Sequence, residues 1–374
     1  MTKPKVRESN LELFRIVVML LIVAHHYVVN SGLLGASSGP IFENLTSFKS
    51  IFLLIAGAWG KTGINCFVLI TGYFMCKSKI TLAKFLKLIG IVMFYKIAIY
   101  FIFVCTSYIS FSIKGLVMAF LPITSVSTGF TGAYLLFFLA IPFLNILISN
   151  LTEKQHLLLI LLTSFIYVFF GTLPIFTVTM NYVSWFSVLY FIASYIRIYP
   201  KKIFSNTRFW GIATLVSLSA SILSILFGIY ISGRVGRDMS HYFVTDSNML
   251  LAVLLGVSSF LFFKNLKIKN SKFINAVSAT CFGILQIHAN SDAMRAWLWG
   301  DTLQNVKVYY TNYTILHFIL SVIGIFAVCS VIEMLRIKFV EKPFFKYWDK
   351  KAPVLESKLK LICSKFNFFK STEE

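Results

Sequence analysis

Long apolar runs dominate the sequence and restrict the chain to a membrane-embedded fold. Runs of about 18–25 mostly apolar residues recur along the 374 residues, which is the length that a helix needs to cross a bilayer. Only 13% of the residues are charged, about half the share found in soluble domains. We therefore predict an all-α, polytopic integral membrane protein with about ten transmembrane helices. The predicted spans are 12–30, 50–75, 86–109, 131–149, 157–172, 183–199, 209–231, 247–263, 275–290 and 312–336.

The basic residues predict the orientation of these spans. The chain has 35 Lys and Arg residues and 14 Asp and Glu residues. Most of the basic residues fall in alternate connections between the spans and in the C-terminal tail. Such an asymmetry is typical of cytoplasmic connections and predicts that both termini lie inside the cell. The net charge of +21 is thus explained by contact with anionic membrane lipid, and no nucleic-acid partner is expected.

Several segments outside the regular spans carry their own predictions. Residues 115–124 are apolar but short, which suggests a re-entrant or interfacial piece, and the ninth span is short enough to be broken. Residues 1–345 are expected to form one transmembrane domain. Residues 346–374 form a basic tail that is either an amphipathic cytoplasmic helix or a solvated segment. The six scattered cysteines predict neither a disulfide framework nor a metal site. The first span lacks a small-residue cleavage site and is interpreted as a retained helix.

The first span carries the densest set of ionisable residues, namely Glu8, Glu12, Arg15, His25 and His26. Eleven positions separate Arg15 from His26, which is about three helical turns, so both side chains fall on one face, about 16 Å apart. His25 lies about 80° from that face. Glu12 precedes Arg15 by three positions and is predicted to pair with it, and Glu8 falls on the same stripe one turn earlier.

Ionisable groups inside a span are candidates for function, because the bilayer makes them costly to keep. An Arg near the inner mouth can bind the phosphates of a cytoplasmic donor, and a deeper His can act as a general base. Alternatively, Glu12 and Arg15 anchor the helix at the membrane interface, and the two histidines form hydrogen bonds between helices. The spacing alone leaves these two interpretations open.

The sequence then resembles the membrane acyltransferase-3 family, in which an Arg is followed by ten residues and a His. Arg15 and His26 match that signature, and Glu12 matches an acidic residue that commonly precedes it. Four further stretches resemble later family motifs in the same order, and they are 65–74, 133–145, 282–288 and 339–344. Thr71 and Tyr73 replace the commoner Ser and Phe, and the usual Trp before Tyr134 is missing.

The resemblance implies an O-acyltransferase that moves acetyl from acetyl-CoA to a hydroxyl of a cell-surface polysaccharide or another envelope glycan. It also implies a multi-pass protein of the bacterial cytoplasmic membrane, with the polysaccharide-synthesis machinery as a candidate partner. The chain ends about thirty residues after the last motif. We therefore expect a stand-alone type without a hydrolase-like SGNH domain, which completes the transfer itself or hands the acyl group to a separate protein.

The resemblance also assigns roles to individual residues. His26 is the expected catalytic base or acyl carrier, Arg15 is expected to contact CoA, and Glu12 to orient Arg15. Lys84 and Lys87 are candidate CoA-phosphate ligands, although many family members have arginines there. The secondary candidates for the site are His25, Glu8, His288, Asn290 and Arg295.

Two other features complete the expectations. Glu333 and Arg336 lie three positions apart in the last span and are predicted to pair, and Glu341 is predicted to end that helix. The competing functions are a transporter or flippase that uses Glu12, Arg15 and His26 as a relay, and a non-catalytic component of polysaccharide export. Apart from the acetyl group that the resemblance implies, the sequence does not predict the acyl group, the acceptor sugar, its hydroxyl, the side on which it is modified or the oligomeric state.

Overall fold

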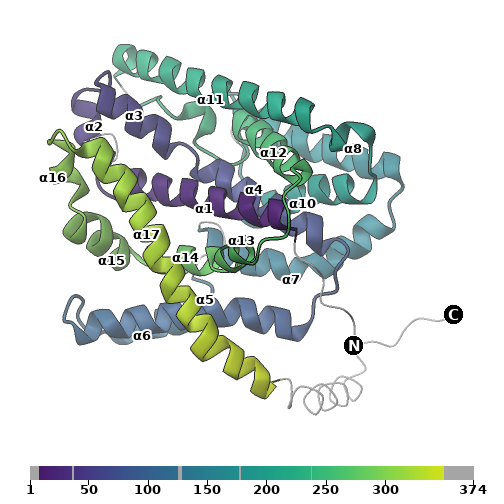
Figure 1. Cartoon of the computed structure of the whole chain (residues 1–374). Helices are drawn as coiled ribbons and strands as arrows, with labels where there is room; N and C mark the ends of the chain where they lie inside the picture. The colour runs from purple at the N-terminus through teal and green to yellow at the C-terminus, as the bar shows by residue number, and fades with distance from the viewer. Residues whose placement is uncertain (1–7, 36–37, 125–128, 177, 237, 349–374) are drawn as a thin grey trace.

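The fold is a bundle of helices without β-strands in the part of the chain that the structure covers (Figure 1). The structure is a computed structural model that describes residues 8–35, 38–124, 129–176, 178–236 and 238–348. The all-α, polytopic architecture predicted from the apolar runs is confirmed. The orientation of the bundle across the membrane stays a prediction.

Among the described residues, seven helical stretches are long and apolar enough to cross a bilayer, and two shorter apolar helices accompany them. The long stretches are α1 (Ser9–Val29), α3 with α4 (Phe48–Gly57 and Gly60–Met75), α5 (Leu82–Cys105), α7 (Phe130–Ser149), α8 with its π-helical and α9 extensions (Glu153–Thr172), α11 (Thr207–Val235) and α17 (Thr314–Arg336), which continues to Trp348. The shorter ones are α10 (Tyr182–Ile198) and α12 (Leu250–Asn265).

The ninth predicted span is indeed broken. It consists of α13 (Lys272–Ser278) and α14 (Cys281–His288), and two residues separate them. The short apolar stretch around residue 115 is the helix α6 (Ile113–Phe120), which packs on α5. The other short α-helices are α2 (Pro40–Glu43), α15 (Asp292–Arg295) with a π-helical turn after it (Ala296–Thr302), and α16 (Asn305–Tyr309). Two 3-10 helices cover Lys202–Ser205 and Tyr242–Val244.

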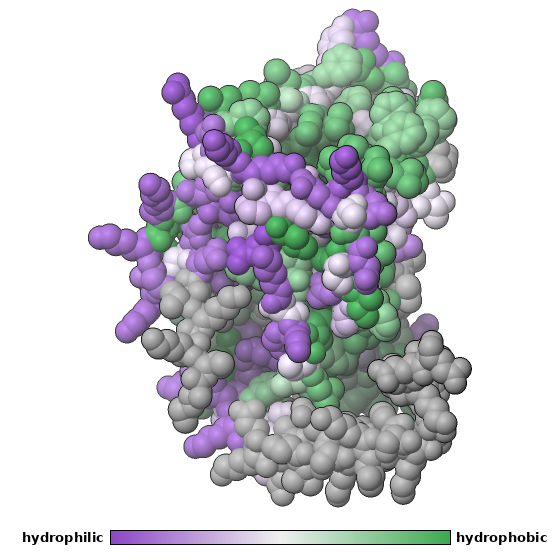
Figure 2. All heavy atoms as spheres, turned by 90° about the vertical axis from the view of Figure 1, so that its right-hand side faces the viewer, coloured by the Kyte–Doolittle hydropathy of each residue, from purple (hydrophilic) through white to green (hydrophobic). Residues whose placement is uncertain are grey.

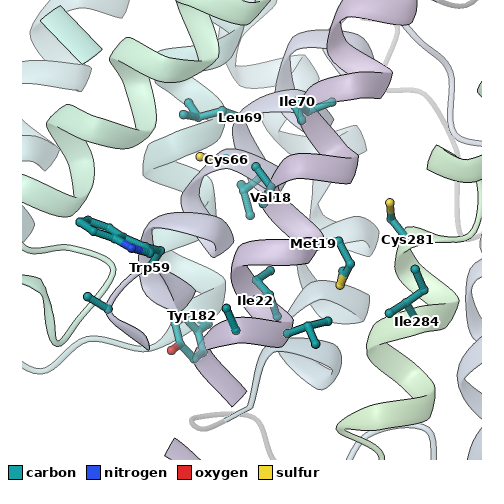
Figure 3. Packing of buried hydrophobic residues seen from close by; sticks show 14 of the residues in the cluster. Val18, Met19, Ile22, Trp59, Cys66, Leu69, Ile70, Tyr182, Cys281 and Ile284 are labelled. Atoms are coloured by element: carbon teal, nitrogen blue, oxygen red, sulfur yellow. The ribbon is translucent and has the colours of Figure 1, made fainter. Parts of the chain in front are cut away.

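The helix α1 forms the centre of the bundle and contacts α3, α4, α12, α13, α14 and α17. Its middle is apolar, and Val18, Met19 and Ile22 are buried against neighbouring helices. Figure 3 shows these side chains beside Cys66 and Ile70 of the second span and Ile284 of α14. The central position of α1 explains why its few polar groups all meet protein partners and not lipid.

The second predicted span is one hydrophobic stretch but two helices. Ala58 and Trp59 interrupt it, and the imidazole Nδ1 of His25 lies 2.5 Å from the carbonyl oxygen of Gly57. The ring of His25 also covers Gly60, where a β-carbon would overlap it. The break thus follows from the ring of His25, which contacts the carbonyl oxygen of Gly57 and fills the space beside Gly60.

Hydrophilic side chains gather at the end of the bundle where α1 begins and α17 ends (Figure 2). Because the spans alternate in direction, the connections from α4 to α5, from α7 to α8 and from α10 to α11 reach the same end. They carry the exposed Lys77, Lys79, Lys201 and Lys202. This is the end that the basic residues predict to be cytoplasmic. The predicted tail, 346–374, lies outside the described residues from 349 onward.

A buried ionic network joins α5 to α17. The guanidinium of Arg336 donates to both oxygens of Glu333 at 2.7 and 2.8 Å and to Glu341 at 2.6 Å. Tyr95 donates to Glu333 at 2.7 Å, and Lys87 pairs with Glu341 at 2.5 Å. The predicted pairing of Glu333 with Arg336 is confirmed. The prediction that Glu341 ends the helix is wrong. Its carboxylate binds two cations, it closes a π-helical turn (Ile337–Glu341), and the chain continues as α-helix through residues 342–348.

Gly283 provides a test of how tightly α14 packs on α17. A β-carbon at Gly283 would overlap the carboxyl group of Glu333, whereas one at Gly324 of α17 meets no atom within 4 Å. We expect Gly283→Ala to destabilise the protein by about 1–3 kcal/mol through overpacking. Gly324→Ala, the matched control, should be neutral or stabilising because alanine favours helix. Thermal unfolding in detergent would measure both, and equal midpoints for the two variants would contradict this packing.

Candidate active site

A cavity of about 440 Å³ lies among α1, α4, α5, α7 and α14, in the half of the bundle away from the hydrophilic end. Both adjacent histidines of α1, His25 and His26, line it. Pro122 and Thr124, which follow α6, and the first residues of α7 also belong to its wall. Tyr182 of α10 lines it as well, so six separate parts of the chain build the cavity around the C-terminal end of α1.

His26 and His288 form a hydrogen-bonded pair at this cavity. The Nδ1 atom of His26 lies 2.9 Å from Nε2 of His288, although the residues are 262 positions apart. The Nδ1 atom of His288 lies 2.6 Å from the carbonyl oxygen of Ile284. Because a carbonyl oxygen only accepts, Nδ1 of a neutral His288 carries the proton and its Nε2 is an acceptor. The Nδ1 atom of His26 must then donate, which leaves the lone pair of His26 on Nε2.

This arrangement suits a general base. His288 is fully buried and His26 lines the cavity, so the pair runs from the protein interior to the space where a ligand can lie. A second group that fixes the tautomer of a histidine also stabilises the imidazolium that forms when the histidine takes a proton. The free Nε2 of His26 is the atom of the pair that is left to receive it.

The other secondary candidates from the late motif also reach the cavity. Asn290 and Arg295 line it, and Asn290 donates to the carbonyl oxygen of Gln286 at 3.0 Å. Arg295 pairs with Asp292 at 2.5 Å. Gln286 donates to the hydroxyl of Thr131 at 2.9 Å, and both side chains face the same cavity. The structure therefore brings His25, His26, His288, Asn290 and Arg295 together.

Two lysines in this cavity were missed by the sequence analysis. Lys61 belongs to α4 and Lys96 to the middle of α5, so both lie within predicted spans. A lysine at the centre of a span costs about 2.5–3.5 kcal/mol to insert and marks a functional site by default. That rule could have identified both residues before the structure was known. Lys61 donates to the hydroxyl of Tyr182 at 2.7 Å, and Lys96 donates to the carbonyl oxygen of Leu121.

Arg15 and Glu12 lie at the opposite end of α1 and do not line the cavity. Their predicted pairing is confirmed, since Nη1 of Arg15 lies 3.0 Å from the nearer oxygen of Glu12. Ser278, next to the break between α13 and α14, donates to the same carboxylate. The guanidinium lies 6.0 Å from the ring centroid of Phe74, which belongs to the second motif. The contact of Arg15 with CoA stays a prediction.

The remaining candidates lie near the predicted cytoplasmic end. Glu8 caps the N-terminus of α1 through its backbone and is exposed. Lys84 donates to the carbonyl oxygen of Lys79, and Lys87 belongs to the network described above. The contact of Lys84 and Lys87 with phosphate stays a prediction.

The second motif holds helices together. Asn65 is fully buried, donates to the carbonyl oxygen of Ser247 at 2.7 Å and accepts from the indole of Trp185 at 2.9 Å. Thr71 lies 2.9 Å from the hydroxyl of Tyr134, which connects the second motif to the one in α7. These contacts are satisfied within the bundle and join α4 to α7, to α10 and to the residues that precede α12. Within the described ranges, no three His, Cys, Asp or Glu side chains are grouped as metal ligands would be.

Comparison with known proteins identifies the family. A family model described as an acyltransferase domain, that of the acyltransferase-3 family, matches residues 8–334, which is most of the chain. No curated protein and no solved structure gives a significant match. The match contains α1, the cavity and the broken ninth span, and it agrees with the resemblance found in the motifs. The chain thus belongs to the acyltransferase-3 family and is a multi-pass membrane acyltransferase.

Proposed function

We propose that the protein is an O-acetyltransferase of the bacterial cytoplasmic membrane. It moves the acetyl group of acetyl-CoA to a hydroxyl of a cell-surface polysaccharide or another envelope glycan. The observation that carries the proposal is the His26–His288 pair, whose tautomers leave the Nε2 lone pair of His26 free beside a polar cavity.

The chemistry follows from that geometry. The acceptor hydroxyl gives its proton to Nε2 of His26 while its oxygen attacks the thioester carbonyl carbon. A carbon–oxygen bond forms, the carbon–sulfur bond breaks, and the thiolate of CoA takes the proton from His26. Throughout, Nδ1 of His26 donates to His288, which holds the ring in place and stabilises the transient imidazolium. The products are the O-acetyl ester and free CoA.

The donor is proposed to enter from the cytoplasmic end. Arg15 is held by Glu12 near that end, and a guanidinium is well suited to bind phosphate oxygens. Lys84 and Lys87 lie in the same half of the molecule, at the start of α5, and are proposed to add to the attraction for CoA. The acyl end would then extend along α1 toward His26, about 16 Å from Arg15 by the rise of the helix.

The proposal is tested by ester-linked acetate on envelope polysaccharide. Cells lacking the protein should lose that acetate, and the parent gene should restore it. Isolated membranes from the complemented cells should transfer label from acetyl-CoA to polysaccharide taken from the deletion strain. If surface glycan falls in amount while its acetate content per sugar is unchanged, a transporter would replace the enzyme that we propose.

A further inference from the structure

Three cationic side chains surround the cavity that contains His26. They are Lys61 of α4, Lys96 of α5 and Arg295 of α15. Among the described residues, no Asp or Glu side chain lines this cavity. Its wall is thus strongly positive, although it lies in the half of the bundle remote from the basic connections.

The cations of the cavity are only partly neutralised by neighbouring carboxylates. The ammonium of Lys61 lies 3.8 Å from Asp246, and Arg295 pairs with an Asp292 side chain that is 99% exposed. Within the described ranges, Lys96 has no carboxylate within 4 Å, and it donates to a backbone carbonyl oxygen. A cation in the middle of a span normally has a counter-charge or faces a water-filled path for a charged ligand.

Neutral hydrogen-bonding groups share the cavity with these cations. Gln286, Thr131 and Asn290 present amide and hydroxyl groups of the kind that bind sugar hydroxyls. A site with both kinds of group matches a sugar that carries a negative charge. A neutral sugar would leave the charge of Lys96 without a counter-charge in the middle of a span.

We propose that the acceptor is an acidic glycan, whose carboxylate or phosphate lies between Lys96 and Lys61 while its reacting hydroxyl lies at His26. This inference rests on the proposed function and adds the chemical class of the acceptor. The two lysines act as specificity-determining residues. They place the anionic group on the α4–α5 side of the cavity, and the imidazole of α1 meets the hydroxyl.

The test compares three forms of one acceptor. Polysaccharide from cells lacking the protein is used untreated, after reduction of its carboxyl groups to alcohols, and after removal of its phosphates. Full-length protein in membranes is supplied with labelled acetyl-CoA. One treatment should lower kcat/KM for the parent protein about tenfold or more, mainly through KM, and that treatment identifies the anionic group.

Substitutions at the two lysines, measured on the untreated and the treated polymers, show whether the lysines recognise the anionic group. Lys96→Met should lower kcat/KM on the untreated polymer to about the level of the treated one, and it should have little further effect on the treated polymer. Lys61→Met should act in the same direction. Lys96→Arg, which keeps the charge, should retain the preference and guards against a simple folding defect. Lys114→Met, an exposed lysine of α6, is the matched control and should behave like the parent.

Three outcomes separate the possible failures. Equal acetylation of all three polymers by the parent would overturn the acidic acceptor while leaving the acetyltransferase intact. If Lys96→Met raises KM for acetyl-CoA and leaves KM for the polymer unchanged, the lysines bind the acyl donor. That result would also overturn the acidic acceptor. If the parent transfers acetyl to none of the three polymers, the proposed function itself fails and the inference falls with it.

Discussion

His26→Ala should lower the rate of acetyl transfer by about 10²- to 10⁴-fold, which is the contribution of a positioned general base. The loss should appear in kcat, because the imidazole acts on the proton that moves in the transition state. The ratio of rates is obtained from the transfer of labelled acetyl from acetyl-CoA in membranes that contain equal amounts of parent and variant protein. His156→Gln is the control, since His156 bonds to the carbonyl oxygen of Phe191 and does not line the cavity.

His288 should act as a positioning residue for His26. His288→Gln keeps an oxygen that can accept from Nδ1 of His26, so it should retain much more activity than His288→Leu. Its pH–rate profile should also stay closer to that of the parent, because the tautomer of His26 is preserved. Parent-like rates in His26→Ala, or identical rates in the two His288 variants, would contradict the assignment of the pair.

Arg336→Met should destabilise the bundle by about 3–5 kcal/mol, because it leaves the buried carboxylate of Glu333 without its cation. Glu341 loses one partner as well but keeps Lys87. The expected result is a lower yield of folded protein and a lower thermal midpoint in detergent. Arg208→Met, at an exposed position of α11, should change the midpoint little.

A second substitution separates charge from packing in that network. Glu333→Gln in the Arg336→Met background removes the unpaired charge and keeps a hydrogen-bond partner for Tyr95. It should recover a large part of the lost stability. If the double variant is as unstable as Arg336→Met alone, the loss arises from the packing of the arginine stem, and the electrostatic explanation is wrong.

The spans could be predicted from the sequence because their length and apolarity are local properties of each segment. The pairing of Glu12 with Arg15 was predictable for the same reason, since three positions fix the geometry along one helix. The break at Ala58 and Trp59 was not, because it depends on His25 from another helix. No local pattern encodes a contact of that kind.

The candidate site was predictable only in part. The motifs indicated His26, His288, Asn290 and Arg295, but their spacing could not show that His26 and His288 touch, since that contact depends on how α14 packs beside α1. Lys61 and Lys96 were overlooked although their position in apolar spans marked them. The separation of Arg15 from the cavity follows from the straight course of α1, as eleven helical positions predict.

The apolar layer in the middle of α1 has a consequence for the energised membrane. Val18, Met19 and Ile22 separate the ion pair at one end of the helix from the polar cavity at the other. A continuous file of water between those ends would conduct protons and dissipate the gradient that the cell maintains. Close packing of this layer (Figure 3) seals the bundle electrically. The acyl end of CoA, which we propose to extend along α1, is uncharged and would displace such side chains without carrying ions.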